Sequence, residues 1–375
     1  MKFLQNQWCS YAIHIMIWLG CMGLIYSMLY IGHGDISDQE QVDSSAGKRV
    51  LRVLAWGDLF DKTYMQKFEA QEGITVHIGA YTSNEELLVK LRATGGAEYD
   101  VIFPSDYAVK ILRDHNLLKH IDTSKIPGFD AILLRLNPHL LGQPYDPANE
   151  YSLPYSWEIF GIAYDKDFFA QHPHLLQRSW SVLFDNPHGA YRVTSSNDPL
   201  EVVRAVAHYL FGPVDWLSDT QVALVQQRLR MQHQWVEAYS STNLDYYIIS
   251  GYAPIAFSSS AYVGRRKQFA SRIGFFVPQE GGLATIENVA LPIRGENEDL
   301  VYKFIEFIYR SEAMKHHAGM FTYFPATNDL LSNEELDPEI RVLLTMPESD
   351  FRRLIFIKQI IPEDRMNDLW VSVKS

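Results

Sequence analysis

Four short segments of this chain place acidic and polar side chains where predicted strands end. They are Trp56-Gly57-Asp58, Ser105-Asp106-Tyr107, Asn197-Asp198-Pro199-Leu200-Glu201 and Thr285-Ile286-Glu287-Asn288. Carboxylates in such positions can cap a helix, contact a ligand, or serve as the acid and base of a hydrolase. Each segment alone fits ordinary capping or an exposed carboxylate, but the common placement at strand ends favours one shared site.

The other polar clusters fit structural or surface roles. His316 and His317 are adjacent, so on a helix their side chains point about 100° apart and cannot both face one metal ion. His172-Pro173-His174 lies in a predicted loop, and Arg265-Arg266-Lys267 fits a solvated helix end. Phosphate-binding glycine loops, the G-x-S-x-G elbow and H-E-x-x-H are not found in the sequence. We therefore predict no catalytic residue, no metal site and no cofactor.

Composition narrows the classes of protein and partner. The 375 residues are enough for two packed units, and 47% hydrophobic with 21% charged residues argues against a disordered or fibrous chain. The formal charge of −12 disfavours a nucleic-acid surface and favours a cationic partner. Both cysteines, Cys9 and Cys21, precede residue 22. A disulfide framework, a cysteine zinc site and thiolate catalysis are thereby excluded from the rest of the chain.

The first part of the body alternates between strand and helix patterns. Apolar runs predict strands over 49–55, 74–80 and 99–103. Helices are predicted from Leu59 to Gly73, from the capping box at Ser83 to Arg92, and after Pro104-Ser105. This order predicts a parallel sheet covered by helices.

The second part of the body repeats the alternation and then returns to the first. Strands are predicted over 159–164, 190–194, 254–257 and 273–277, helices over 200–211 and 221–238, a return segment over 287–292 and a helix over 302–310. We predict an α/β protein of two lobes, with lobe one at 49–156 completed by about 286–323, and lobe two at 157–285 completed by about 327–375. Ligands bind such sheets at the carboxyl ends of strands, which here border the cleft between the lobes.

The N-terminal segment predicts export across a membrane. Residues 11–31 form an apolar run long enough to cross a bilayer of roughly 30 Å. Lys2 precedes the run and acidic residues follow it, so the body is expected outside. Residues 1–31 are predicted to be a signal anchor or a cleaved signal peptide, with lipidation at Cys21 as a further alternative, and residues 32–48 a flexible linker.

Several stretches of the body, taken in order, resemble the spermidine/putrescine-binding proteins of bacterial ABC importers. The most specific are Tyr99-Asp-Val-Ile-Phe-Pro-Ser105, Asn149-Glu-Tyr-Ser-Leu-Pro-Tyr155, Gly281-Gly282 through Ala290-Leu291-Pro292, and Phe324-Pro325-Ala-Thr-Asn328. The resemblance runs from about Arg52 to Asn328 and weakens over the last 45 or so residues. It implies a two-lobed type II periplasmic binding protein that closes on a polyamine in its cleft, works without catalysis, and delivers the ligand to an ABC permease.

The resemblance also implies a set of ligand-binding residues. The acids of the family correspond to Asp58, Asp198, Glu201 and Glu287, the polar contacts to Ser105 and Ser241, and the aromatic walls to Trp56, Tyr107, Phe257 and Phe324. Such a site suits a linear polycation because carboxylates bind ammonium groups while aromatic faces cover the methylene spacers and add cation–π attraction.

Three positions depart from the family pattern. Leu59 stands where the family often has tyrosine, and Phe257 and Thr285 stand where it has tryptophan. Thr285 is still counted among the predicted ligand-binding residues, which brings that set to eleven. The acids persist while the aromatic wall thins, so an amine ligand is better supported than spermidine itself. Two other functions stay open: a membrane-tethered polyamine sensor, which residues 11–31 would anchor, and a periplasmic hydrolase using Asp198, Glu201 or Glu287.

Overall fold

The computed structural model describes residues 49–186, 189–240, 244–265, 271–328 and 351–375. Arg49–Ser375 forms one compact unit. The predicted signal or anchor segment 1–31 and the linker 32–48 lie outside the described residues, as does Ser241. Within the described ranges, no helix is both long and apolar enough to cross a membrane.

The described strands form one mixed sheet that runs through the whole unit. Its central path is β2-β1-β3-β9-β4-β7-β5-β6, with β10 and β8 paired to β4 and β11 paired to β9. The strands are β1 Val50–Trp56, β2 Thr75–Tyr81, β3 Val101–Ile102, β4 Ser152–Asp165, β5 Val193–Ser196, β6 Val236–Ser240, β7 Ile255–Ser259, β8 Ile273–Phe276, β9 Leu283–Ala290, β10 Phe324–Pro325 and β11 Ile355–Phe356.

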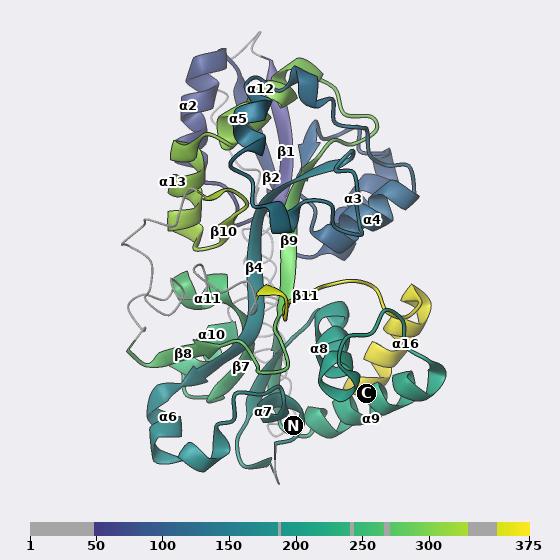
Figure 1. The fold of residues 1–375 in the computed structure, drawn as a ribbon, viewed down its shortest axis with the longest axis vertical. Helices are drawn as coiled ribbons and strands as arrows, with labels where there is room; N and C mark the ends of the chain where they lie inside the picture. Colours follow the sequence, from purple (N-terminus) through teal and green to yellow (C-terminus); the bar gives the residue numbers. More distant parts are fainter. Residues whose placement is uncertain (1–48, 187–188, 241–243, 266–270, 329–350) are drawn as a thin grey trace, which may run out of the picture. The chain divides into compact units, whose positions relative to one another are not determined.

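The helices gather around the two ends of this sheet (Figure 1). Around one end lie α2 Lys62–Glu72, α3 Asn84–Thr94, α4 Asp106–Asp114, α5 Phe129–Leu133, α12 Glu298–Ile308 and α13 Ser311–Phe321. Around the other lie α6 Lys166–Gln171, α7 Ser181–Phe184, α8 Pro199–Phe211, α9 Asp219–His233, α10 Leu244–Ile249, α11 Ser260–Arg265 and α16 Glu363–Lys374. We call these the first and the second lobe.

Strands β4 and β9 connect the two lobes. β4 is 14 residues long and almost entirely buried, as its mostly apolar sequence SLPYSWEIFGIAYD indicates for a strand covered on both faces. It pairs antiparallel with β9 and β7. The predicted boundary between residues 156 and 157 falls inside β4, and the exact lobe limits stay a prediction.

Short capping motifs set where the helices begin and end. The Asp61 carboxylate accepts a hydrogen bond from the Thr63 backbone N–H, so α2 begins at Lys62 rather than at Leu59. The Ser83 hydroxyl accepts from the Glu86 backbone N–H, which is one of the two hydrogen bonds of the predicted capping box; the Glu86 carboxylate accepts from the Thr82 backbone N–H at 2.9 Å instead of from that of Ser83. Gly73 ends α2 in the left-handed conformation, with φ of 67°.

The structure corrects two features of the predicted elements. The parallel pairing of β1 with β2 and β3 is confirmed, but β9 returns antiparallel to β3, so the sheet is mixed rather than parallel. The helix predicted over 221–238 ends at His233, because Val236–Ser240 forms β6 against β5. Pairing between strands distant in the sequence overrides the local helix pattern there.

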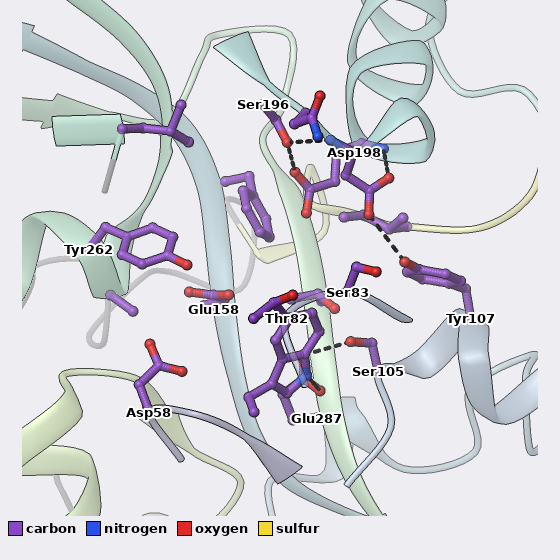
Figure 2. Close-up of a pocket in the computed structure, with 18 of the residues that line it drawn as sticks. Asp58, Thr82, Ser83, Ser105, Tyr107, Glu158, Ser196, Asp198, Tyr262 and Glu287 are labelled. Atoms are coloured by element: carbon purple, nitrogen blue, oxygen red, sulfur yellow. Dashed lines mark hydrogen bonds between the residues drawn. The ribbon is translucent and has the colours of Figure 1, made fainter. Parts of the chain in front are cut away.

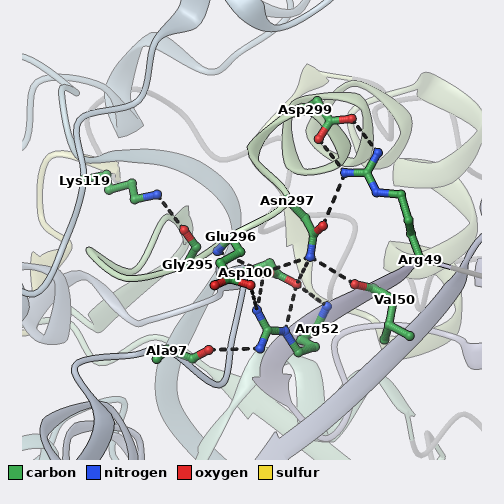
Figure 3. Close-up of polar contacts among 10 residues, drawn as sticks. All are labelled: Arg49, Val50, Arg52, Ala97, Asp100, Lys119, Gly295, Glu296, Asn297 and Asp299. Atoms are coloured by element: carbon green, nitrogen blue, oxygen red, sulfur yellow. Dashed lines mark hydrogen bonds and ion pairs between the residues drawn. The ribbon is translucent and has the colours of Figure 1, made fainter.

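A buried carboxylate fixes the return of the chain to the first lobe (Figure 3). Asp100, just before β3, accepts hydrogen bonds from the Arg52 guanidinium at 2.8 and 3.1 Å and from the Arg52 backbone N–H at 2.8 Å. It also accepts from the Glu296 backbone N–H at 3.1 Å, just before α12. These bonds join β1, β3 and the segment that leads into α12.

The close packing of β4 against β8 gives a test of the sheet. A Cβ atom added at Gly161 would lie 2.6 Å from the backbone oxygen of Phe276, whereas one added at Gly79 would meet only ordinary contacts, the nearest at 3.5 Å. We expect Gly161→Ala to lower the free energy of unfolding by about 1–3 kcal/mol, measured by urea denaturation, because backbone must shift. Gly79→Ala is the control, and equal stability of the two variants would contradict the packing.

Candidate ligand-binding site

A cavity of about 440 Å³ lies between the strand ends and helices of the two lobes (Figure 2). The structure brings together eight of the eleven site residues predicted from the sequence: Trp56, Asp58, Ser105, Tyr107, Asp198, Glu201, Thr285 and Glu287. Phe257 and Phe324 are buried elsewhere and do not line the cavity. Ser241 lies outside the described residues.

Glu287 lies on β9 and receives hydrogen bonds from two sequence segments. The Trp56 indole N–H donates to its Oε2 at 2.7 Å, and the Ser105 hydroxyl donates to its Oε1 at 2.8 Å. Burial raises the pKa of the Glu287 carboxyl well above its usual value, and the two hydrogen bonds oppose that rise. Because both donors are neutral, the Glu287 carboxylate can still attract a cation.

Ser105 shows how the local alternatives resolve. It precedes α4, but its side chain makes no capping hydrogen bond there. Its hydroxyl instead donates to Glu287 and accepts from the Asn84 side-chain amide at 3.1 Å. The capping interpretation is therefore wrong for Ser105, which belongs to the cavity wall.

Asp198 both caps α8 and faces the cavity. Its Oδ1 accepts from the backbone N–H groups of Leu200 and Glu201 at 2.8 and 3.3 Å. Its Oδ2 accepts from the Tyr107 hydroxyl of the first lobe at 3.2 Å. The two oxygens thus serve the two roles that the sequence presented as alternatives.

Glu201 completes an acidic pair at the same end of the cavity. The Ser196 hydroxyl donates to its Oε2 at 2.5 Å. Burial raises the pKa of both Asp198 and Glu201, and the charge of Asp198 raises that of Glu201 further. Two neighbouring buried carboxyls that resist ionisation are stabilised in their charged form by a cation placed between them.

Asp58 has a partner within the protein. The Arg265 guanidinium, at the end of α11 in the second lobe, donates from Nη1 to Asp58 Oδ2. Its Nε donates to the Phe321 carbonyl at 3.0 Å. The prediction of a solvated basic helix end is wrong for Arg265, because this side chain folds back over the cavity; Arg266 and Lys267 lie outside the described residues.

The sequence analysis missed Glu158, which lies in the middle of β4. It lines the cavity, and burial raises the pKa of its carboxyl to about 7, with the nearby charge of Asp58 adding to the rise. Strand β4 brings it between Glu287 and Tyr262 (Figure 2). A glutamate in the interior of a mostly apolar strand was a signal that could have identified it.

Two of the four predicted aromatic wall residues, Trp56 and Tyr107, line the cavity, whereas Phe257 and Phe324 do not. Phe257 stacks on Phe160 with ring centroids 5.7 Å apart, and Phe324 packs against Trp157 at 4.7 Å, each with its own side chain in the core. The rings that line the cavity are those of Trp56, Tyr107, Trp157, Phe160, Tyr262, Tyr323 and Trp370. The expected thinning of the aromatic wall is therefore offset by side chains on β4, α11 and α16.

Comparison with known proteins identifies the family. A model of bacterial extracellular solute-binding proteins matches residues 63–340. The chain belongs to this family. The spermidine/putrescine-binding periplasmic protein of Salmonella typhimurium is 27% identical to this solute-binding protein over 292 residues, covering 77% of this chain and 80% of the relative. The putrescine-binding periplasmic protein PotF of Escherichia coli is 25% identical and covers 88% of this chain and 93% of the relative.

The fold agrees with this assignment. A solved structure described as a candidate spermidine/putrescine ABC transporter from Listeria monocytogenes matches with a TM-score of 0.77 at 24% identity, covering 87% of this chain and 99% of that one. The structure of PotD from Streptococcus pneumoniae matches with a TM-score of 0.72 at 22% identity, with the same coverage. The predicted α/β solute-binding fold is thereby confirmed.

Buried acids make the stability of the ligand-free solute-binding protein depend on pH. Because the pKa of Glu287 is raised on folding, the folded state binds this proton more tightly, and stability falls as pH rises above the ordinary pKa of a glutamate. We expect Glu287→Gln to raise the midpoint of thermal unfolding at pH 8 by roughly 2 °C or more, and by less at pH 5. Glu363→Gln, at an exposed position of α16, is the control. If Glu287→Gln changed the unfolding midpoint equally at both pH values, this electrostatic cost would be contradicted.

Proposed function

We propose that the protein binds a polyamine, putrescine or spermidine, outside the cytoplasm and delivers it to an ABC permease. The observation that carries the proposal is the ring of carboxylates from Glu158, Asp198, Glu201 and Glu287 around one aromatic-walled cavity. The names of the Salmonella typhimurium and Escherichia coli relatives, which specify spermidine and putrescine binding, support it.

The chemistry of the cavity suits a linear polyamine. Its volume of about 440 Å³ lies in the usual range for small-ligand sites, roughly 300–1,000 Å³. Each ammonium group of a polyamine carries three N–H donors for carboxylate oxygens, and its methylene spacers are apolar. Rings such as Trp56 and Tyr262 can cover these spacers and contribute cation–π attraction of roughly 0.5–2 kcal/mol each.

Contacts across the cleft suggest how binding would be coupled to closure. Tyr107 of the first lobe donates to Asp198 of the second, and the Thr322 hydroxyl after α13 donates to the Ala261 carbonyl in α11 at 2.7 Å. A cation bound between Glu287 and Asp198 would add attraction to carboxylates of both lobes. Such a cation would bind the closed arrangement more tightly than the open one, and it would therefore shift the population toward the closed arrangement.

The proposal extends to location and to the absence of catalysis. We propose that the protein works in the periplasm, held at the inner membrane by residues 11–31, and that Asp198, Glu201 and Glu287 bind an amine rather than transfer protons. The support is the apolar length of 11–31 and the periplasmic relatives, which are binding proteins.

Replacing the acidic pair separates binding from helix capping. Asparagine caps a helix about as well as aspartate, and Asp198→Asn also removes a buried charge, so this variant should not lower the unfolding midpoint. The double variant Asp198→Asn with Glu201→Gln should weaken polyamine binding by about 100-fold or more, because the pairs between the buried carboxylates and the ligand's ammonium groups are lost. Isothermal titration calorimetry with putrescine and spermidine on the chain from Arg49 onward measures this. The charge-matched control is Glu363→Gln with Asp364→Asn, and equal affinities for both double variants would refute the assignment.

Binding should also release protons and strengthen as pH rises. An amine requires ionised carboxylates, and the pKa of Glu158 near 7 means that it is partly protonated in the ligand-free protein at neutral pH. We expect affinity to rise between pH 6 and 8, by about tenfold per pH unit at most for one linked proton. Calorimetry in buffers of different ionisation enthalpy counts the protons, and Glu158→Gln should flatten the dependence. An unchanged dependence of affinity on pH in that variant would show that Glu158 is not the group that releases the proton.

A further inference from the structure

Helix α16 supplies one wall of the cavity and lies in the last part of the chain, where the sequence resemblance to polyamine-binding proteins weakens. Asn367, Trp370 and Lys374 of this helix line the cavity beside Asn197 and Asp198. The helix packs on α9 through buried Met366, Leu369 and Val373. The Gln226 amide of α9 donates to the Ser372 hydroxyl at 2.5 Å, and the Arg230 Nε donates to the Ser372 carbonyl at 3.1 Å. Trp370 and Lys374 are thus held on a fixed element.

The end of α16 encloses an ammonium group. The Lys374 Nζ lies 4.5 Å from the centroid of the Trp370 ring and 4.7 Å from that of Tyr239. The two rings meet edge to face, with centroids 5.4 Å apart and planes at 81°. Lys374 Nζ also donates a hydrogen bond to Asn197 Oδ1. Two aromatic faces and one amide oxygen therefore surround a single cation.

The occupant of this cage has the chemistry of the proposed ligand. A lysine side chain is an ammonium group on a stem of four methylenes, which matches one ammonium group of putrescine together with its four-carbon spacer. Burial lowers the pKa of Lys374, and no opposing effect of a carboxylate accompanies it. The cage therefore recognises an ammonium through rings and an amide, and it lies one residue along the chain from Asp198.

We propose that Asn197, Tyr239 and Trp370 form an accessory ammonium subsite, and that Lys374 competes for it with the outermost ammonium of a long polyamine. The inference rests on the proposed function. A diamine bound between Glu287 and the Asp198–Glu201 pair leaves Lys374 in place. A triamine reaches beyond Asp198 and must displace Lys374, whose tether gives it a high effective concentration. Lys374 thus selects for short ligands.

Removing the Lys374 ammonium tests this selection. Calorimetry with putrescine and spermidine gives the ratio of the two affinities for the wild type and three variants. Lys374→Ala empties the subsite and should shift the ratio toward spermidine by about tenfold. This is the order of affinity that spermidine would gain from one added cation–π site. Lys374→Arg keeps a cation in the cage and should leave the ratio as in the wild type. Lys358→Ala removes a charge from the same chain segment, away from the cavity, and should change the ratio by about twofold at most because salt screens it.

The outcomes separate this inference from the proposed function. A shifted ratio in Lys374→Ala alone supports the subsite, as does spermidine binding that appears only in that variant. An unchanged ratio, with both amines still bound, overturns the subsite and leaves the proposed function intact. Binding of neither amine by the wild type and by Lys374→Ala overturns both. If the alanine variant loses stability, Lys374→Gln removes the charge while keeping most of the stem.

Discussion

The antiparallel register between β4 and β9 is the constraint on which the site depends. Ser156 lies opposite Glu287 and Glu158 lies opposite Thr285, so one strand pair carries two acids of the cavity. Side chains alternate along a strand, and a slip of one strand by one residue would place the two acids on opposite faces of the sheet. The same two strands run through both lobes, so the pairing that joins the lobes also positions the centre of the cavity.

This arrangement leaves buried negative charge that the protein neutralises only in part. Asp58 is paired with Arg265, and Lys374 lies near the Asp198 end in its aromatic cage. The hydrogen-bond donors to Glu287 and Asp198 are neutral indole, hydroxyl and backbone groups. Burial therefore raises the pKa of these acids, and an added cation would recover the free energy that their desolvation costs. The same electrostatics connects stability, pH and ligand affinity.

The sequence predicted site residues correctly where the same residue also takes part in a recognisable local motif. Asp198 and Pro199 form an N-cap pattern that places the carboxylate at the end of a strand, which is also the mouth of the cavity. Trp56 is the last residue of β1 and Ser105 follows β3, and both contact Glu287 although 231 and 182 residues separate them from it. The sequence-based prediction failed where the position of a residue along a strand decides whether its side chain faces the core or the cavity. Phe257 turns into the core against Phe160, while Glu158 in an apolar strand faces the cavity.

The sequence by itself determined the strand and helix order of the first lobe, several helix caps, and four of the acids that border the cavity: Asp58, Asp198, Glu201 and Glu287. These features show in local capping patterns, in apolar periodicity and in the resemblance to a known family. Tertiary structure alone decided the mixed sheet, the pairing of Asp58 with Arg265 and the contribution of α16 to the wall. These features join residues more than a hundred positions apart. The energies that select them come from packing and desolvation, which no local pattern records.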